Sequence, residues 1–120
     1  MDISKTIAKM KTETGFSENV GMVLVHNGVV RGWSRNDKKA VKYIDVSVDK
    51  KKIEALQAEY SNRPGIYKIL IEFESGRLYP GDDLLFIVVA GDIREHVKPV
   101  LSELLNRVKS EAVHKLEKPL

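Results

Sequence analysis

The chain has 120 residues, of which 42% are hydrophobic, and it carries a formal net charge of +3 and no cysteine. This length and composition predict one globular domain over residues 1–120. The absence of cysteine excludes disulfides, thiolate metal sites and cysteine nucleophiles. The N-terminus lacks the apolar stretch of a signal peptide, and the longest apolar run, residues 84–90, is far shorter than the roughly 20 residues of a membrane helix. We therefore expect a soluble, cytoplasmic protein that does not enter a membrane.

Hydrophobic periodicity predicts the secondary structure in chain order. It indicates a helix over 2–12, extended chain over 19–33, a strand over 41–48, a helix over 50–61, a strand over 66–73, a short extended piece over 77–79, a strand over 83–90 and a long helix over 93–116. Strands in hairpin-like pairs favour an α+β fold, with a largely antiparallel sheet and flanking helices.

Two local features refine this prediction. The sequence His26-Asn27-Gly28 interrupts the first extended segment, either as a hairpin turn or as a bulge in one bent strand. Asp49 and Asp92 precede the second and third helices, and we expect both to act as N-caps.

No standard catalytic motif is present, because the chain has no P-loop, no dinucleotide fingerprint and no Gly-x-Ser-x-Gly. His26, His96 and His114 lack the spacing of metal ligands, so no metal site and no cofactor are predicted. From Arg35 to Lys52, seven cations stand against three carboxylates. This cluster is either a solvated loop and helix start or a surface that attracts an anionic ligand, an acidic protein or, as the least favoured interpretation, nucleic acid.

Four further cations are candidates for an anion site. Arg31 follows a predicted strand, Arg94 lies in the first turn of the last predicted helix, and Lys109 and Lys115 lie near the end of that helix. Helix N-termini favour anions, so Arg94 stands at a favourable position. Isolated Arg and Lys side chains are usually solvated. Together the four would form an anion-binding pocket, but their spacing alone does not bring them together.

Several runs of sequence, in their order and spacing, carry a family resemblance. They are Gly28-Val-Val-Arg31, Arg63-Pro-Gly-Ile-Tyr-Lys-Ile-Leu-Ile, Ser75-Gly-Arg-Leu-Tyr-Pro-Gly-Asp, Phe86-Ile-Val-Val-Ala-Gly-Asp-Ile-Arg and Arg107-Val-Lys-Ser-Glu. Over residues 20–117 the chain thus resembles a divergent large subunit of molybdopterin synthase. That resemblance implies an α/β-hammerhead fold and a homodimer of large subunits within a heterotetramer. Each large subunit binds a small ubiquitin-like sulfur carrier, whose thiocarboxylate supplies sulfur to cyclic pyranopterin monophosphate to form molybdopterin.

The resemblance also implies roles for individual residues. Arg31 and Arg94 would hold the phosphate and pterin region of the substrate, and Lys109 matches one of the two catalytic lysines. If one residue is deleted from the alignment, Lys115 and Glu117 match the second lysine and the glutamate after it, with Glu117 on the substrate side. Without the deletion, Leu116 takes the place of that lysine.

The chain also departs from the family pattern. Ile93 stands where the family has a histidine, and Phe73-Glu74 stands where it usually has His-Arg. These departures leave a second interpretation open. In it, the chain is a catalytically inactive binding module of the same fold, which recognises a sulfur-carrier tail or a pterin-like anion.

Overall fold

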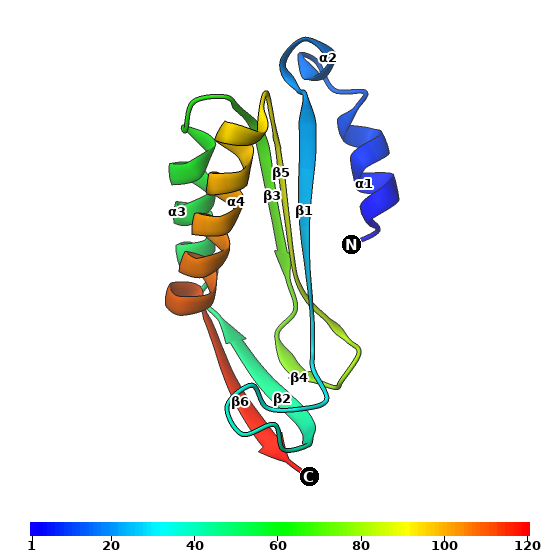
Figure 1. The fold of residues 1–120 in the computed structure, drawn as a ribbon, viewed down its shortest axis with the longest axis vertical. Helices are drawn as coiled ribbons and strands as arrows, with labels where there is room; N and C mark the ends of the chain where they lie inside the picture. Colours follow the sequence, from blue (N-terminus) through cyan, green and yellow to red (C-terminus); the bar gives the residue numbers. More distant parts are fainter.

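A computed structural model describes residues 1–120, and it contains two three-stranded antiparallel sheets with helices on both faces of the first (Figure 1). The elements are α1 (Ile3–Met10), α2 (Phe16–Asn19), β1 (Met22–Val29), β2 (Val41–Val48), α3 (Lys50–Ser61), β3 (Ile66–Phe73), β4 (Gly76–Leu78), β5 (Asp83–Gly91), α4 (Arg94–Arg107), the π-helical turn η1 (Val108–Ala112) and β6 (Val113–Pro119). This confirms the α+β class and the antiparallel pairing.

The first sheet has the strand order β1-β5-β3 and contains most of the core. All residues of β5 except Asp83 are buried, because α3 and α4 cover one face of this central strand and α1 covers the other (Figure 1). A strand covered on both faces needs apolar side chains on both, which explains the uninterrupted apolar run of residues 84–90. No helix in the structure combines the length and the hydropathy needed to cross a membrane.

Alternation along β1 decides which of its side chains face the helices. Leu24 packs against the main core cluster beneath α3 and α4, whereas Val23 and Val25 pack on the α1 side. Side chains two residues apart point to the same face of a strand. His26 and Gly28 therefore face the same side as Leu24. Of the two alternatives for His26-Asn27-Gly28, the structure has the bulge in one continuous strand, located between Gly28 and Val29.

The second sheet has the order β4-β2-β6 and lies beyond the helices, at the end of the molecule that holds the C-terminus (Figure 1). Here the prediction of one helix over 93–116 is wrong. The α-helix ends at Arg107, the chain makes a π-helical turn, and residues 113–119 pair with β2 as a strand. Lys, Leu and Glu have good helix propensity, but the open edge of β2 offers hydrogen bonds that outweigh this preference.

Two smaller predictions near the other end also need correction. The short helix α2 was not expected. It follows Gly15 and has only four residues, which is too short to show a helical pattern in the sequence. The N-cap of α4 is Ile93 and not Asp92. The Asp92 carboxylate instead accepts a hydrogen bond from the backbone N–H of Ile93 and contacts Nδ1 of His96 at 2.8 Å. Asp49 does cap α3, since its carboxylate accepts from the backbone N–H of Lys52 at 3.0 Å.

Glu111 joins the π-helical turn to both neighbouring helices. Its carboxylate accepts a hydrogen bond from Nε of Arg107 at 2.7 Å and lies 3.0 Å from Nζ of Lys52. These hydrogen bonds, that of Arg107 first, lower the pKa of Glu111 to about 2. The turn is thus held by ion pairs that persist into strongly acidic solution.

We expect Glu111→Gln to remove a stabilising contribution that depends on pH. The pKa in the folded state, about 2, lies below the ordinary value of 4.5. The contribution is therefore complete above the ordinary value and is lost as the pH falls toward the lower one. Urea unfolding of both proteins should show a difference in the free energy of unfolding that is constant near neutral pH and shrinks in that acidic window. Glu54→Gln, which removes an exposed carboxylate from α3, is the control. A difference that stays constant throughout would contradict the prediction.

Candidate functional site

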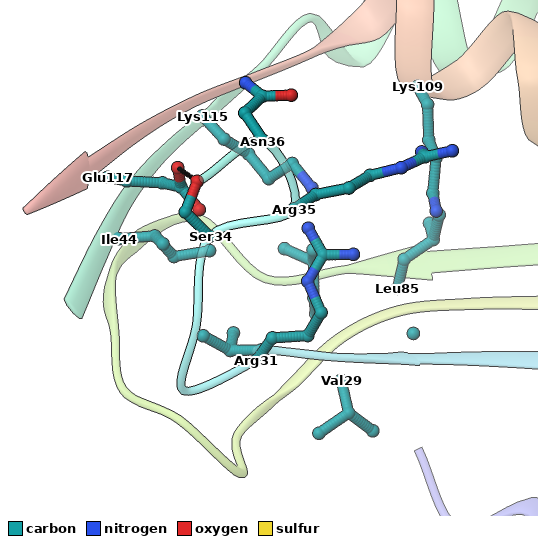
Figure 2. A pocket seen from close by; sticks show the side chains of 13 residues that line it. Val29, Arg31, Ser34, Arg35, Asn36, Ile44, Leu85, Lys109, Lys115 and Glu117 are labelled. Atoms are coloured by element: carbon teal, nitrogen blue, oxygen red, sulfur yellow. Dashed lines mark hydrogen bonds between the residues drawn. The ribbon is translucent and has the colours of Figure 1, made fainter. Parts of the chain in front are cut away.

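A cavity of about 320 Å³ opens where the loop after β1, the turn η1 and strand β6 meet (Figure 2). Its lining combines an apolar floor from the two sheets with charged side chains from the loop, the turn and β6. The lining residues are Gly28, Val29, Val30, Arg31, Ser34, Arg35, Asn36, Ile44, Leu84, Leu85, Lys109, Lys115 and Glu117.

Pairing of β6 with β2 directs two side chains into this cavity. Lys115 stands opposite Val46, and Glu117 stands opposite Ile44. Residues directly opposite each other in an antiparallel pair share a face of the sheet. Because Ile44 and Val46 are both buried, Lys115 and Glu117 project from the core-facing side.

The same register shows which of the two residues, Lys115 or Leu116, faces the cavity. Leu116 lies between the inward residues, pairs with Asp45 on the outer face and is 76% exposed. A strand has a side-chain period of two, so Leu116 and Lys115 cannot both enter the cavity. In this fold Lys115 occupies the inward position, as the alignment with one deletion requires.

Lys109 reaches the cavity from the π-helical turn. This turn follows α4 directly and contains two buried residues, Val108 and Ala112. Its end is fixed where the backbone N–H of Asp49 donates to the carbonyl of Ala112 at 2.8 Å. The turn thus joins the helix to β6 and presents Lys109 to the same cavity as Lys115 (Figure 2). Single π-helical turns are frequent at functional sites.

The loop between β1 and β2 supplies the two arginines. It is held by backbone hydrogen bonds from Ser34 to Lys39 and from Lys38 to Ser34, each 2.8 Å long. The Ser34 hydroxyl also donates to the Glu117 carboxylate at 2.9 Å, which ties the loop to β6. Arg31 lies over the ring of Trp33, with its guanidinium carbon 5.1 Å from the ring centre. A stacked guanidinium keeps its N–H donors free for a ligand.

The charges of the cavity are strongly unbalanced. Arg31, Arg35, Lys109 and Lys115 stand against Glu117 alone, which leaves a net +3. Partial burial first, and then the charges of Lys109, Arg31 and Arg35, lower the pKa of Lys115, while Glu117 opposes the shift. Crowded cations of this kind favour an anionic guest and make a lysine a better proton donor or acceptor near neutral pH.

Pairing of the arginines separates this site from the rest of the surface. The chain has six arginines, and the four outside the cavity each form an ion pair with a carboxylate. Arg31 and Arg35 have no such partner, and the carboxylate nearest to them in the cavity is bonded to Ser34. Unpaired arginines that converge on one cavity are the arrangement expected for a phosphate or carboxylate ligand.

The structure does not bring Arg94 to this cavity. It lies at the N-terminus of α4, at the end of the molecule away from β6 (Figure 1), and its side chain is 77% exposed and paired with Glu95. Of the five predicted site residues, the other four line the cavity. Glu74 lines a smaller adjoining cavity of about 20 Å³ together with both lysines. Nowhere do three or more His, Cys, Asp or Glu side chains gather in a way that would hold a metal ion.

Sequence reasoning missed Arg35, Ser34 and Asn36, which also line the cavity. Arg35 had been assigned only to a diffuse basic cluster, and no periodic pattern marks a loop residue. The proximity of Arg31 in sequence was the one available signal. His26 was considered only as a metal ligand, although its side chain lies close to the cavity wall formed by Gly28.

Solved structures show where this fold occurs. The chain is similar to molybdopterin synthase from Staphylococcus aureus, with a TM-score of 0.72 and 22% identity over 91% of this chain and 85% of that one. It is also similar to molybdopterin cofactor biosynthesis protein E from Burkholderia multivorans, with a TM-score of 0.75 and 23% identity over 100% of this chain and 82% of that one. For one chain of a complex of subunits 1 and 2 of molybdopterin-converting factor from Helicobacter pylori, the TM-score is 0.69 and the identity 16%, over 98% of this chain and 78% of that one.

Comparison by sequence gives a more specific result than comparison by fold. No curated protein matches the chain. The family model described as MoaE protein matches residues 1–111, which include Arg31, Arg35 and Lys109 and stop just before β6. Because this match extends over most residues of the chain, the chain belongs to the MoaE protein family.

Proposed function

We propose that this protein acts in molybdenum cofactor biosynthesis, as the sulfurtransferase subunit that forms molybdopterin. In this proposal it takes sulfur from the thiocarboxylate of a carrier protein and transfers it to cyclic pyranopterin monophosphate. The observation that carries the proposal is one cavity that combines two lysines with the two arginines that lack carboxylate partners. Membership of the MoaE family supports the same pathway.

Each group in the cavity has a role that its chemistry suits. Arg31 and Arg35 bind the substrate phosphate, since a guanidinium offers paired N–H donors to phosphate oxygens. Lys109 and Lys115 act as general acid and base, because the lowered pKa of Lys115 increases its neutral fraction near neutral pH. Glu117 orients the loop through Ser34 and partly balances the positive charge.

The proposed partners follow from the reaction. A small ubiquitin-like carrier brings the sulfur, so the reaction itself requires no cysteine in this chain. One of the similar structures is a complex of two subunits of molybdopterin-converting factor, which supports a small partner subunit here. We further propose a homodimer of this chain within a heterotetramer, located in the cytoplasm.

A second function is favoured by one feature of the site. Glu74 stands where the family usually has a cation and lies in the small cavity next to both lysines, and this reversal of charge disfavours catalysis by the lysine pair. The alternative is therefore a binding module that recognises a carrier tail or a pterin-like anion without catalysis. It differs from the first proposal in that no product forms while the carrier still binds.

A product assay separates the two functions. The purified protein is mixed with thiocarboxylated carrier and cyclic pyranopterin monophosphate, and molybdopterin is detected after oxidation to its fluorescent derivative. Carrier with an ordinary carboxylate terminus is the control, because it has no sulfur to donate. Product that appears only with thiocarboxylate supports the sulfurtransferase. Binding of the carrier or of cyclic pyranopterin monophosphate without product supports the binding module, and the absence of product and of both kinds of binding would overturn both functions.

A further inference from the structure

A histidine lies directly behind the cavity wall and has no hydrogen-bond partner at one ring nitrogen. His26 is on β1, opposite the fully buried Ile87, and faces the helices. Its Nε2 is the one buried side-chain nitrogen or oxygen atom in the chain without a hydrogen bond. An unsatisfied buried polar atom is costly, so one that persists in a fold calls for an explanation.

The adjacent glycine shows where this nitrogen points. A Cβ placed on Gly28 would lie 3.1 Å from Nε2 of His26, so the ring nitrogen is directed along the strand toward Gly28. Gly28 itself lines the cavity together with Leu85 and Lys109. The absence of a side chain at Gly28 leaves room for the imidazole behind this part of the cavity wall.

Lys109 can supply a donor. Its ammonium group carries three N–H donors, and, like most lysines of the chain, it forms no ion pair. It is also the charged group that acts on His26: burial first, and the charge of Lys109 second, lower the pKa of the imidazole. His26 is therefore neutral at neutral pH, and a neutral imidazole with its proton on Nδ1 offers Nε2 as an acceptor.

We propose that His26 is the positioning residue of Lys109, and that its Nε2 accepts a hydrogen bond from the Lys109 ammonium group at the inner end of the cavity. In this proposal the flexible side chain of Lys109 rotates to form the bond. The hydrogen bond gives the buried nitrogen a donor and holds the Lys109 side chain in one position between catalytic cycles. The inference rests on the proposed function for the role of Lys109, but the proposed bond does not depend on substrate.

The test is the pKa of Lys109 in the substrate-free protein. Lysine labelled with carbon-13 at Cε is followed by NMR from neutral to strongly alkaline pH, and the Lys109 signal is assigned by its absence in Lys109→Arg. A hydrogen bond to the charged form raises the pKa of a lysine, so His26→Phe, which keeps the ring volume, should lower the pKa of Lys109 by roughly half a unit or more. His26→Gln, which restores an acceptor, should recover most of that loss.

Two controls keep the result specific. His96→Phe removes a histidine near the N-terminus of α4, where it contacts Asp92, and should leave the pKa of Lys109 unchanged. Thermal melting establishes that His26→Phe is folded. An unchanged pKa of Lys109 in folded His26→Phe would overturn the inference, as would a melting temperature that rises because an unpaired nitrogen has been removed. The test needs no sulfur transfer, so its failure is distinct from a failed product assay.

Discussion

Replacing either lysine of the cavity with alanine is expected to reduce molybdopterin formation by about 10²- to 10⁴-fold, the usual contribution of a general acid or base. Lys109 and Lys115 enter the cavity from different elements, so neither substitutes for the other. Product formation is measured with saturating thiocarboxylated carrier, and carrier affinity is measured in parallel. We expect carrier affinity to change far less than the rate, because each variant loses one contact of many.

Two matched variants test whether position matters more than charge. Lys118→Ala removes a lysine from the exposed, outward-facing set on β6 and should leave the rate unchanged. The double variant Lys115→Leu with Leu116→Lys keeps the composition and net charge but moves the ammonium group to the outer face. It should be as defective as Lys115→Ala. Normal activity in the double variant would show that the inward position of Lys115 is not required.

The largest effect on binding is expected from the two unpaired arginines. Loss of a hydrogen bond to a charged group costs about 1.5–3 kcal/mol, so Arg31→Met and Arg35→Met should each weaken phosphate binding roughly tenfold to a hundredfold. Methionine keeps much of the length of the side chain and removes its charge and its donors. The measurement is calorimetric titration with inorganic phosphate and then with cyclic pyranopterin monophosphate.

Arg63→Met serves as the control for this pair. It removes one guanidinium and the same charge, but Arg63 is paired with Glu103 between α3 and α4. Phosphate affinity should stay within a small factor of the original value, because Arg63 does not line the cavity and salt screens the interaction between exposed charges that are far apart. If Arg63→Met weakened binding as much as Arg35→Met, net charge and not the cavity would explain the affinity.

Most of the strands were predictable from the sequence, because their hydrophobic patterns agree with their surroundings. The apolar run of β5 and the alternation of β2 each match the burial that the fold gives them. The C-terminal strand was not predictable in this way. Residues 113–119 contain good helix formers, and they form a strand only because β2, more than 60 positions earlier, offers them an edge. Long-range pairing of this kind leaves no periodic signal within the segment itself.

The family pattern led to part of the cavity only. The resemblance marked Arg31 and Lys109, which line the cavity, and Arg94, which does not. It left Lys115 and Leu116 as alternatives, of which Lys115 points inward in the strand register. Arg35 depends on the path of a loop, which local sequence does not determine. His26 depends on a space created by Gly28, and such a contact becomes visible only when side chains are placed.

The partnership of β2 with β6 also determines when the cavity is completed during synthesis. All three strands of the first sheet exist once Gly91 has been made, and proteins are synthesised from the N-terminus onward. The second sheet must wait for residues 113–119, and until then one edge of β2 is open and Lys115 is absent. An unpaired strand edge is a template for unwanted association. The nascent chain therefore builds the first sheet before the second, and it acquires its reactive lysine pair in the same step that pairs the open edge of β2.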